Sequence, residues 1–413
     1  MSRRDGFDGD WVEVNIDSYF DQRTAFSFTA SVSGVKGDEA ITNNGNNWDA
    51  TWDPIWHLET SIDNKGWVAE IQIPFTQLRF SNNAEQIWGL QFTRRFFRKE
   101  ELSNWQYIPQ DEAGWVHHFG ELRGIKGIQP KKQMEISPYV VSKMNTYEKK
   151  PGNPFADGRD YGYDIGLDGK IGVTNDFTLD FTINPDFGQV EADPSEVNLT
   201  AFESYFEEKR PFFIEGRNIT DFQLSDGGNP FSSDNLFYSR RIGRSPHYYP
   251  ELNDNEYADV PDRTRILGAA KLTGKTKNGL SLGFIESVTT QEKADVLRDG
   301  QKGKEMVEPW SNYFVGRLQK DMNEGNTILG GLITSTNRFN MTENLDYLNR
   351  NAYSGGIDFT QYWGEKKYYV KFNYTMSHIM GTEEAMIYQQ ESSRRYFQRP
   401  DNTYATSDST RNT

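Results

Sequence analysis

The chain contains no cysteine, and this absence removes several classes of protein. With none among 413 residues, disulfide scaffolds, zinc–thiolate centres and cysteine nucleophiles are excluded. The sequence also has no run of about 18 apolar residues, so it predicts no transmembrane helix. Its first residues, MSRRDGFDGDW, lack the apolar core of a signal peptide. We therefore expect either a protein that stays inside the cell or, as we favour, an internal fragment of a longer protein.

Positive charge and aliphatic side chains are also scarce. The 45 Lys and Arg residues are outnumbered by 60 Asp and Glu residues, and the net charge of −15 argues against nucleic acid or anionic lipid as a partner. Hydrophobic residues make up 35% of the chain and aromatic residues 14%, and the mean hydropathy is −0.78. This composition favours β-structure in which apolar and polar residues alternate. Such strands can still cross a membrane, because about 9–11 residues suffice.

Sequence signatures of catalysis are missing as well. The chain has no H-E-x-x-H motif, no G-x-S-x-G motif and no phosphate-cradling glycine loop. His117 and His118 would point to opposite faces of a strand, and no third ligand follows at metal spacing. No two carboxylates stand out as the acid and the nucleophile of a glycosidase. The sequence therefore favours a protein that is not an enzyme.

Residues 1–130 contain short stretches in which apolar and polar residues alternate, as is typical of half-buried strands. They predict a β-sandwich. A sandwich usually has seven or more strands, so we expect the missing ones to precede Met1. Gly120–Pro130 is interpreted as the connector to the next domain. The four expected strands are Trp11–Ile16, Ala25–Val32, Gly66–Ile73 and Trp88–Phe97.

Residues 131–413 alternate more regularly, as in Phe177–Ile183 and Val370–Ser377. Short turns join the strands of four hairpins, and long polar connections separate the hairpins, which is typical of an outer-membrane barrel. With strand 134–144 we count about nine strands, whereas bacterial barrels have even numbers, so both ends of the chain are expected to be truncated. The expected hairpins are 162–173 with 177–184, 264–273 with 280–288, 312–321 with 327–336, and 353–362 with 368–378. The long connections are 185–263, 289–311, 337–352 and the tail from 379.

The connection 185–263 carries a helical pattern. Asp193 and Glu196 form a predicted capping box around Pro194. An apolar helix face follows, and Arg210-Pro211 is expected to stop the helix before an apolar plug, 212–214. We place all of 185–263, including Leu236–Arg244, on the outer side of the barrel or inside its lumen. The apolar helix face consists of Leu199, Phe202 and Phe206.

Two sets of motifs resemble known families. The first set resembles family-9 carbohydrate-binding modules, which implies a sugar-binding β-sandwich. It consists of DWVEVNIDSYFD (Asp10–Asp21), AFSF (Ala25–Phe28), GWVAEIQIPFTQLRF (Gly66–Phe80) and WGLQFTRR (Trp88–Arg95). The second set is NPDFGQVEADPSEVNLTAFESYFEEKRPFFIEG (Asn184–Gly216) with LFYSRRIGR (Leu236–Arg244). It resembles a family of Gram-negative outer-membrane proteins of unknown function. Those proteins pair such a module with a large barrel, which implies a periplasmic sandwich, a signal peptide upstream and more barrel strands downstream.

Candidate binding residues follow from these patterns. Four tryptophans in or near loops could stack on sugar rings, although covering the sandwich core is the competing interpretation. Asp17 and Asp21 could hold calcium with loop carbonyls, although acidic residues more often form turns. Calcium is the one cofactor that the sequence suggests. The four tryptophans are Trp48, Trp52, Trp56 and Trp105.

Charged residues of the central segment are expected to line a polar lumen as part of a gate or plug. The alternative is a structural brace whose charges are solvated or paired. These residues are Glu203, Glu207, Glu208, Lys209, Arg210, Glu215 and Arg217.

The sequence thus predicts an all-β chain with two domains. Residues 1–130 form a partial β-sandwich, and 131–413 form an incomplete antiparallel outer-membrane barrel with a plug or loop segment at 185–263. We expect a non-enzymatic protein of the Gram-negative outer membrane that binds or transports envelope glycans. Its expected partners are membrane lipid, glycan and other outer-membrane proteins. Two alternatives stay open: a glycan hydrolase with carboxyl groups about 5–10 Å apart, or a structural partner in an outer-membrane assembly.

Overall fold

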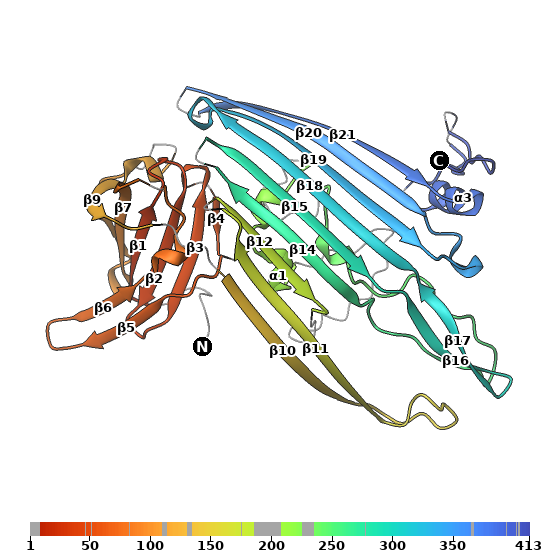
Figure 1. The fold of residues 1–413 in the computed structure, drawn as a ribbon. Coiled ribbons are helices and arrows are strands. Elements are labelled where there is room, and N and C mark those ends of the chain that lie inside the picture. Colours follow the sequence, from red (N-terminus) through yellow and green to blue (C-terminus); the bar gives the residue numbers. More distant parts are fainter. Residues whose placement is uncertain are drawn as a thin grey trace.

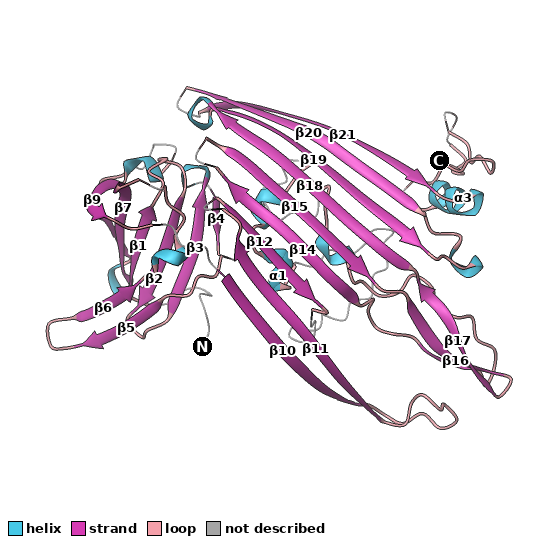
Figure 2. Cartoon of the chain, in the orientation of Figure 1, coloured by secondary structure: helices cyan, strands magenta, loops and turns pink. Residues whose placement is uncertain are grey.

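The computed structural model consists mostly of β-strands arranged in antiparallel sheets (Figures 1 and 2). The prediction of an all-β chain is confirmed. None of the helices among the described residues is long and apolar enough to cross a membrane. The structure describes residues 9–45, 47–50, 52–81, 83–109, 114–129, 134–174, 176–185, 208–224, 235–276, 278–364, 367–393, 395–401, 403 and 405–413.

The N-terminal part of the chain forms a seven-stranded sheet and a two-stranded hairpin that packs against it. The sheet has the order β4-β3-β2-β1-β7-β8, and β9 also pairs with β7. Its strands are β1 (Trp11–Asp17), β2 (Ala25–Ser31), β3 (Lys36–Thr42), β4 (Asn47–Asp49), β7 (Glu85–Phe96), β8 (Glu101–Asn104) and β9 (Gly120–Lys126). The hairpin consists of β5 (His57–Ile62) and β6 (Trp67–Gln72).

Two expectations about this part are wrong. The predicted four strands are nine, and the supposed connector at 120–130 contains β9, which pairs with β7. The missed strands are short and polar: β4 has three residues and β8 reads ELSN, with all four side chains exposed. Such strands carry no alternating apolar signal, because their backbone pairing, rather than side-chain burial, holds them in the sheet.

The core between the sheet and the hairpin is aromatic. Trp56 is 1% exposed, its ring centroid lies 5.5 Å from that of Phe28, and its indole N–H donates a hydrogen bond to Asp38 Oδ2 at 3.0 Å. Phe80 and Trp88 are 0% and 2% exposed and extend the same cluster. Burying these rings provides much of the stability of the N-terminal part.

The second part is a nine-stranded antiparallel sheet with strand order β10-β11-β12-β14-β15-β18-β19-β20-β21. All four predicted hairpins and the strand expected at 134–144 are present. In the described residues the outermost strands, β10 and β21, do not pair with each other, so the sheet is open. Its strands are β10 (Met134–Thr146), β11 (Arg159–Gly172), β12 (Phe177–Ile183), β14 (Ile266–Lys275), β15 (Leu280–Thr289), β18 (Trp310–Met322), β19 (Thr327–Phe339), β20 (Asn351–Trp363) and β21 (Tyr368–Met380).

The connection 289–311 was expected to be a long loop, and this expectation is also wrong. It folds into β16 (Glu292–Arg298) and β17 (Gln301–Glu308), which form a small sheet with β13 (Tyr257–Asp259). Ala294, Val296 and Val307 are buried there in a core of their own. The charged residues between these apolar positions hid the strand pattern in the sequence.

The segment between β12 and β14 lies against one face of the large sheet. Its described residues 208–224 and 235–244, here called the covering segment, include the short helices α1 (Pro211–Ile214) and α2 (Arg217–Thr220). Residues 236–244 form no strand and contain only a 3-10 turn at Ser239–Arg241, as our placement of this connection required. A further helix, α3 (Glu383–Glu391), follows β21.

The stretch 212–214, expected as an apolar plug, lies within α1. Pro211 begins this short helix, because proline lacks the N–H that the first helical turn leaves unpaired. The helix predicted from Asp193 to Lys209, with Leu199, Phe202 and Phe206, lies almost entirely in 186–207, outside the described residues.

The two faces of the large sheet differ in polarity, and the polar face is the buried one. In β12, Thr178, Asp180 and Thr182 are buried toward the covering segment, whereas Ile183 on the other face is 51% exposed. In β18, Arg317 is 4% exposed and its neighbour Leu318 is 52% exposed. We call these the covered face and the open face. A sheet of a water-soluble protein shows the opposite arrangement.

Aromatic residues gather at both ends of the open face. At the end nearer the N-terminal part, Trp363 pairs with Tyr368 across β20 and β21. At the far end, Trp310 pairs with Phe339 across β18 and β19. Trp363, Tyr368 and Phe339 are all at least half exposed. The middle of the open face, between these two aromatic rows, is aliphatic at Ile333 and Ile357.

Replacing Trp56 should destabilise the N-terminal part strongly, because the change leaves a large cavity in its core. We expect Trp56→Ala to lower the free energy of unfolding by about 3–5 kcal/mol. Trp105→Ala is the matched control: Trp105 is 53% exposed, and its loss should cost less than about 1 kcal/mol. Chemical denaturation followed by tryptophan fluorescence measures both values. Equal losses for the two variants would contradict this account of the core.

Candidate functional site

The covering segment approaches the sheet closely at two glycines. A methyl group built on Gly283 of β15 would lie 2.8 Å from Thr220 Cγ2 in α2. One built on Gly356 of β20 would lie 2.8 Å from Phe222 Cζ. Only glycine leaves enough room at these positions, so the sequence of the strands is adapted to the segment that lies on them.

Three phenylalanines of the covering segment each contact a cation. Lys271 Nζ of β14 lies 5.0 Å from the ring centroid of Phe212, and the Arg317 guanidinium of β18 lies 5.2 Å from that of Phe222. The Arg210 guanidinium lies 4.3 Å from the Phe213 ring. Lys271 also donates hydrogen bonds to the carbonyl oxygens of Phe212 and Glu215 at 2.6 and 2.7 Å. Lys271 and Arg317, buried cations of the sheet, therefore hold the covering segment on the covered face.

A buried ion pair joins the two halves of the covering segment. Arg210 donates to both carboxylate oxygens of Glu208 at 2.7 and 2.6 Å, and to the carbonyl oxygens of Ser239 and Ile242 at 2.8 and 2.6 Å. The Ser239 hydroxyl donates to Glu208 Oε2 at 2.5 Å. Burial raises the pKa of Glu208, but the hydrogen bonds and charge of Arg210 outweigh that effect and hold the pKa below its usual value.

The residues predicted to line a lumen differ in their surroundings: some form ion pairs, and others are exposed or half-buried. Glu208 and Arg210 pair with each other, and Glu215 pairs with Lys170 of β11 at 2.6 Å. These contacts match the structural-brace alternative. Lys209 is exposed and Arg217 half-buried. Glu203 and Glu207 lie outside the described residues.

The N-terminal part sits at the short-turn end of the sheet (Figure 1). The Tyr19 hydroxyl donates to Asp176 Oδ1 at 2.5 Å, and Arg79 donates to the Thr178 hydroxyl at 2.8 Å. Arg23 pairs with Asp321 at 2.9 Å. Burial and the hydrogen bond to Asp176 raise the pKa of Tyr19, so its hydroxyl keeps its proton.

A cavity of about 300 Å³, here called the junction cavity, lies between the two parts. The covered face and the covering segment form one side of it, with Lys275, Asp180 and Ile219 among the lining residues. From the N-terminal part it is lined by Tyr19, Asp21, Phe26, Asp49, Trp52 and Arg79, among others.

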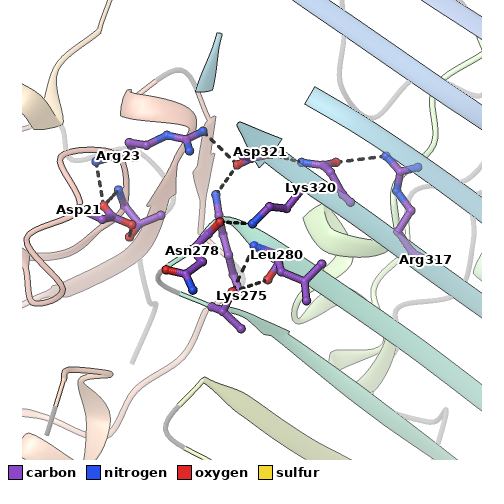
Figure 3. A network of polar contacts seen from close by, with 11 residues as sticks. Asp21, Arg23, Lys275, Asn278, Leu280, Arg317, Lys320 and Asp321 are labelled. Carbon is purple, nitrogen blue, oxygen red and sulfur yellow. Dashed lines mark hydrogen bonds and ion pairs between the residues drawn. The ribbon is translucent and has the colours of Figure 1, made fainter. Parts of the chain in front are cut away.

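A polar network leads from this cavity across the sheet (Figure 3). Asp321 accepts hydrogen bonds from Lys275, Arg23 and Gln319 at 2.8, 2.9 and 3.0 Å. Arg317 donates to Gln319 Oε1 at 3.1 Å and pairs with Asp358 of β20. The side chain of Asp321 is only 3% exposed, so it depends on these cations to remain charged.

The four predicted sugar-stacking tryptophans do not converge. Trp52 lines the junction cavity and packs 4.7 Å from Phe26. Trp56 is buried in the core, so the packing interpretation applies to it and sugar stacking does not fit. Trp48 packs 4.9 Å from Trp115 in a separate cluster, and Trp105 is exposed at the edge of the sheet. Of the four, Trp52 alone lines this cavity.

Asp17 and Asp21, the predicted calcium ligands, bind backbone amides. Asp17 Oδ2 accepts from Gln22 N at 2.8 Å, and Asp21 Oδ1 accepts from Thr24 N at 2.7 Å. The described residues contain no group of three or more His, Cys, Asp or Glu side chains placed to hold a metal. Turn formation explains both aspartates, and calcium binding stays a prediction.

Sequence reasoning missed the residues that join the two parts. Tyr19 and Arg79 lie within the stretches DWVEVNIDSYFD and LRF, and their partners Asp176 and Thr178 flank the start of β12. Position next to a short turn is the only signal that could have pointed to these partners, because the contacts span 157 and 99 residues of sequence.

Asp17 should make stability depend on pH. Burial, and secondly the charge of Asp21, raise its pKa from 3.8 to about 7. Because the folded state binds this proton more tightly than the unfolded state, the free energy of unfolding should fall as pH rises from about 4 to about 7. In Asp17→Asn, the free energy of unfolding should fall by a few kcal/mol less over this pH range, since one unit of pKa is about 1.4 kcal/mol.

Tryptophan fluorescence can follow this unfolding, because eight of the ten tryptophans lie in residues 11–115. Denaturation at several pH values gives the slope for each protein. Identical slopes for Asp17→Asn and the unchanged protein would contradict the assignment.

Comparison with known proteins identifies a family for the larger part of the chain. A search of the curated proteins finds no match. A family model described as "Domain of unknown function (DUF5916)" matches residues 130–405. The matched residues make up more than half of the chain and include the large sheet, the small sheet and the covering segment. The chain therefore belongs to the DUF5916 family.

Proposed function

We propose that the nine-stranded sheet is part of the wall of an outer-membrane β-barrel. In this proposal the open face contacts lipid, the covering segment fills the interior as a plug, and the N-terminal part is a periplasmic sandwich. The observation that carries the proposal is the polarity of the sheet, which buries charge on one face and exposes apolar side chains on the other.

The exposed apolar surface of the open face supports the proposal. Leu318, Ile333, Ile357 and Phe372, on four successive strands, are each 52–59% exposed on the open face. Contiguous apolar patches of this kind mark contact with a membrane or a partner. The strands β18 to β21 each have 13 residues, and about 9–11 are needed to cross a bilayer. The aromatic residues at both ends of this face match the girdles of membrane barrels.

The connections support an orientation. The connections after β18 and after β20 are short, since β19 begins at Thr327 and β21 at Tyr368, and these strand ends lie where the N-terminal part docks. The connections that contain β16, β17 and α3 emerge at the opposite end (Figure 1). In outer-membrane barrels the short turns are periplasmic and the long loops extracellular, which supports a periplasmic location for the N-terminal part in this proposal.

The junction cavity is the best candidate for glycan binding. It brings the indole of Trp52 together with the carboxylate of Asp21 and the hydroxyls of Thr24 and Thr178. An indole can stack on the C–H face of a sugar ring, while carboxylates and hydroxyls bind its hydroxyl groups. Of the carboxylates contributed by the sheet, Asp180 contacts Lys271 and Asp321 pairs with Lys275.

Neighbouring residues of one strand should report opposite environments. The chain lacks cysteine, so single-cysteine variants can be labelled without background. Ile333 and Thr334 lie at the middle of β19, on the open and covered faces respectively. In protein reconstituted into vesicles, a fluorophore on Ile333→Cys should be quenched by lipids carrying a nitroxide on the acyl chain. On Thr334→Cys it should be quenched far less. Equal quenching at both positions, or quenching of both by aqueous iodide alone, would contradict the barrel.

Glycan binding should depend on Trp52. On a glycan array probed with the full chain, Trp52→Phe should weaken binding up to about tenfold, because an aromatic contact contributes about 0.5–1.5 kcal/mol. The phenylalanine keeps most of the packing against Phe26. Trp105→Phe lies outside the cavity and should bind as the unchanged protein does. Loss of binding in Trp105→Phe alone would move the site elsewhere. Absence of any binding would remove the glycan proposal and leave the barrel proposal standing.

A further inference from the structure

We propose that a second cavity, at the end of the covered face away from the N-terminal part, binds a small solute carrying phosphate or carboxylate groups. This cavity, of about 320 Å³, is here called the arginine cavity. It lies between the covering segment, strands β18 to β21 and the residues that follow α3. Its cationic lining residues are Arg241, Arg244, Arg338, Arg395 and His247.

The charge of this cavity is the reverse of the charge of the chain. The protein has a net charge of −15, yet the described residues that line the cavity include four arginines and no aspartate or glutamate. Beside the cavity, Glu308 accepts a hydrogen bond from the backbone N–H of His247 and lies 2.7 Å from its Nδ1. A concave site of one sign concentrates ions of the other.

A hydrogen bond to the backbone fixes the position of one of the lining arginines, Arg338. Its Nη1 donates to the Asn349 carbonyl oxygen at 2.6 Å, which fixes the guanidinium at the end of β19. Its Nε–H is buried and has no hydrogen-bond acceptor among the described residues. A buried donor without an acceptor costs free energy, and a small shift of the guanidinium toward an oxyanion in the cavity would supply the acceptor.

The residue types select the class of ligand. The planar guanidinium group has donors spaced to bind two oxygens of one carboxylate or phosphate. Tyr313, Thr336 and Ser354 add hydroxyl groups to the lining, which suit the polar remainder of such a solute. A volume of about 320 Å³ fits a small solute and not a polymer. The cavity is on the covered face, so lipid that contacts the open face cannot supply the anion.

The barrel proposal gives no role to the arginines in one stretch of the covering segment. LFYSRRIGR, Leu236–Arg244, forms no strand, and its aliphatic and aromatic residues anchor it: Ile242 is buried against Ile266 and Val315. That anchoring leaves Arg241 and Arg244 at the cavity, where both are exposed. The inference does not depend on glycan binding, because the junction cavity lies at the other end of the covering segment.

Calorimetric titration of the full chain in non-ionic detergent tests the proposal, with inorganic phosphate and citrate as probes. We expect at least one probe to bind, and added salt to weaken its binding. Arg241→Gln and Arg244→Gln should each raise the Kd about tenfold, equivalent to about 1.4 kcal/mol. Binding of phosphate alone would identify a phosphate-bearing solute, and binding of citrate alone a carboxylate-bearing one.

Arg298→Gln is the matched control, because Arg298 pairs with Glu305 in the small sheet and does not line the cavity. Its Kd should stay within about twofold of that of the unchanged protein. Arg241 and Arg244 are both exposed, so neither replacement is expected to prevent folding. The proposal is overturned if neither probe binds below about 10 mM, or if Arg298→Gln weakens binding as much as the cavity variants do.

Discussion

The burial of charge on one face of the large sheet is the constraint on which the rest of the structure depends. Lys271 and Arg317 are almost fully buried in a sheet whose other face is apolar and exposed. Buried cations are stable only when carbonyls, carboxylates or aromatic rings surround them. The covering segment supplies these partners through the Phe212 and Glu215 carbonyls and the Phe222 ring. Segment and sheet are thus mutually required, and glycine at Gly283 and Gly356 allows their close contact.

Along the covered face of strand β18, the covering segment lies between the two cavities. Asp321 and Gln319, near the short turn, face the junction cavity; Val315 packs against the covering segment; and Tyr313 faces the arginine cavity. The covering segment therefore separates two polar cavities of different charge. In a membrane barrel this arrangement would put one binding site at each end of a closed interior. A solute could pass between the ends only if the covering segment moved, which would require breaking the contacts of Lys271 and Arg317 with it.

Much of the large sheet could be predicted because its signal is local. Alternation in Phe177–Ile183 and turn residues such as Asn278-Gly279 define strands within a few positions. The short polar strands could not be predicted, since ELSN in β8 has no apolar periodicity. The candidate site was the least predictable part. The sequence suggested both Trp52 and Trp56 as sugar-stacking residues because of their residue type. Only the structure shows that Trp56 is buried in the core, whereas Trp52 lines the junction cavity. The contact of Tyr19 with Asp176 joins residues 157 positions apart, and no local pattern encodes such a pairing.

The most direct test of the account is whether the two tryptophans of the large sheet contact lipid. Trp310 and Trp363 lie at opposite ends of the open face. In vesicles containing brominated lipids, part of the tryptophan fluorescence should be quenched, and that part should disappear in the double variant Trp310→Phe and Trp363→Phe. The remaining eight tryptophans, in the N-terminal part, should be unaffected by the lipid. If the quenched fraction is the same in the double variant and the unchanged protein, the open face does not contact the bilayer and the barrel account is wrong.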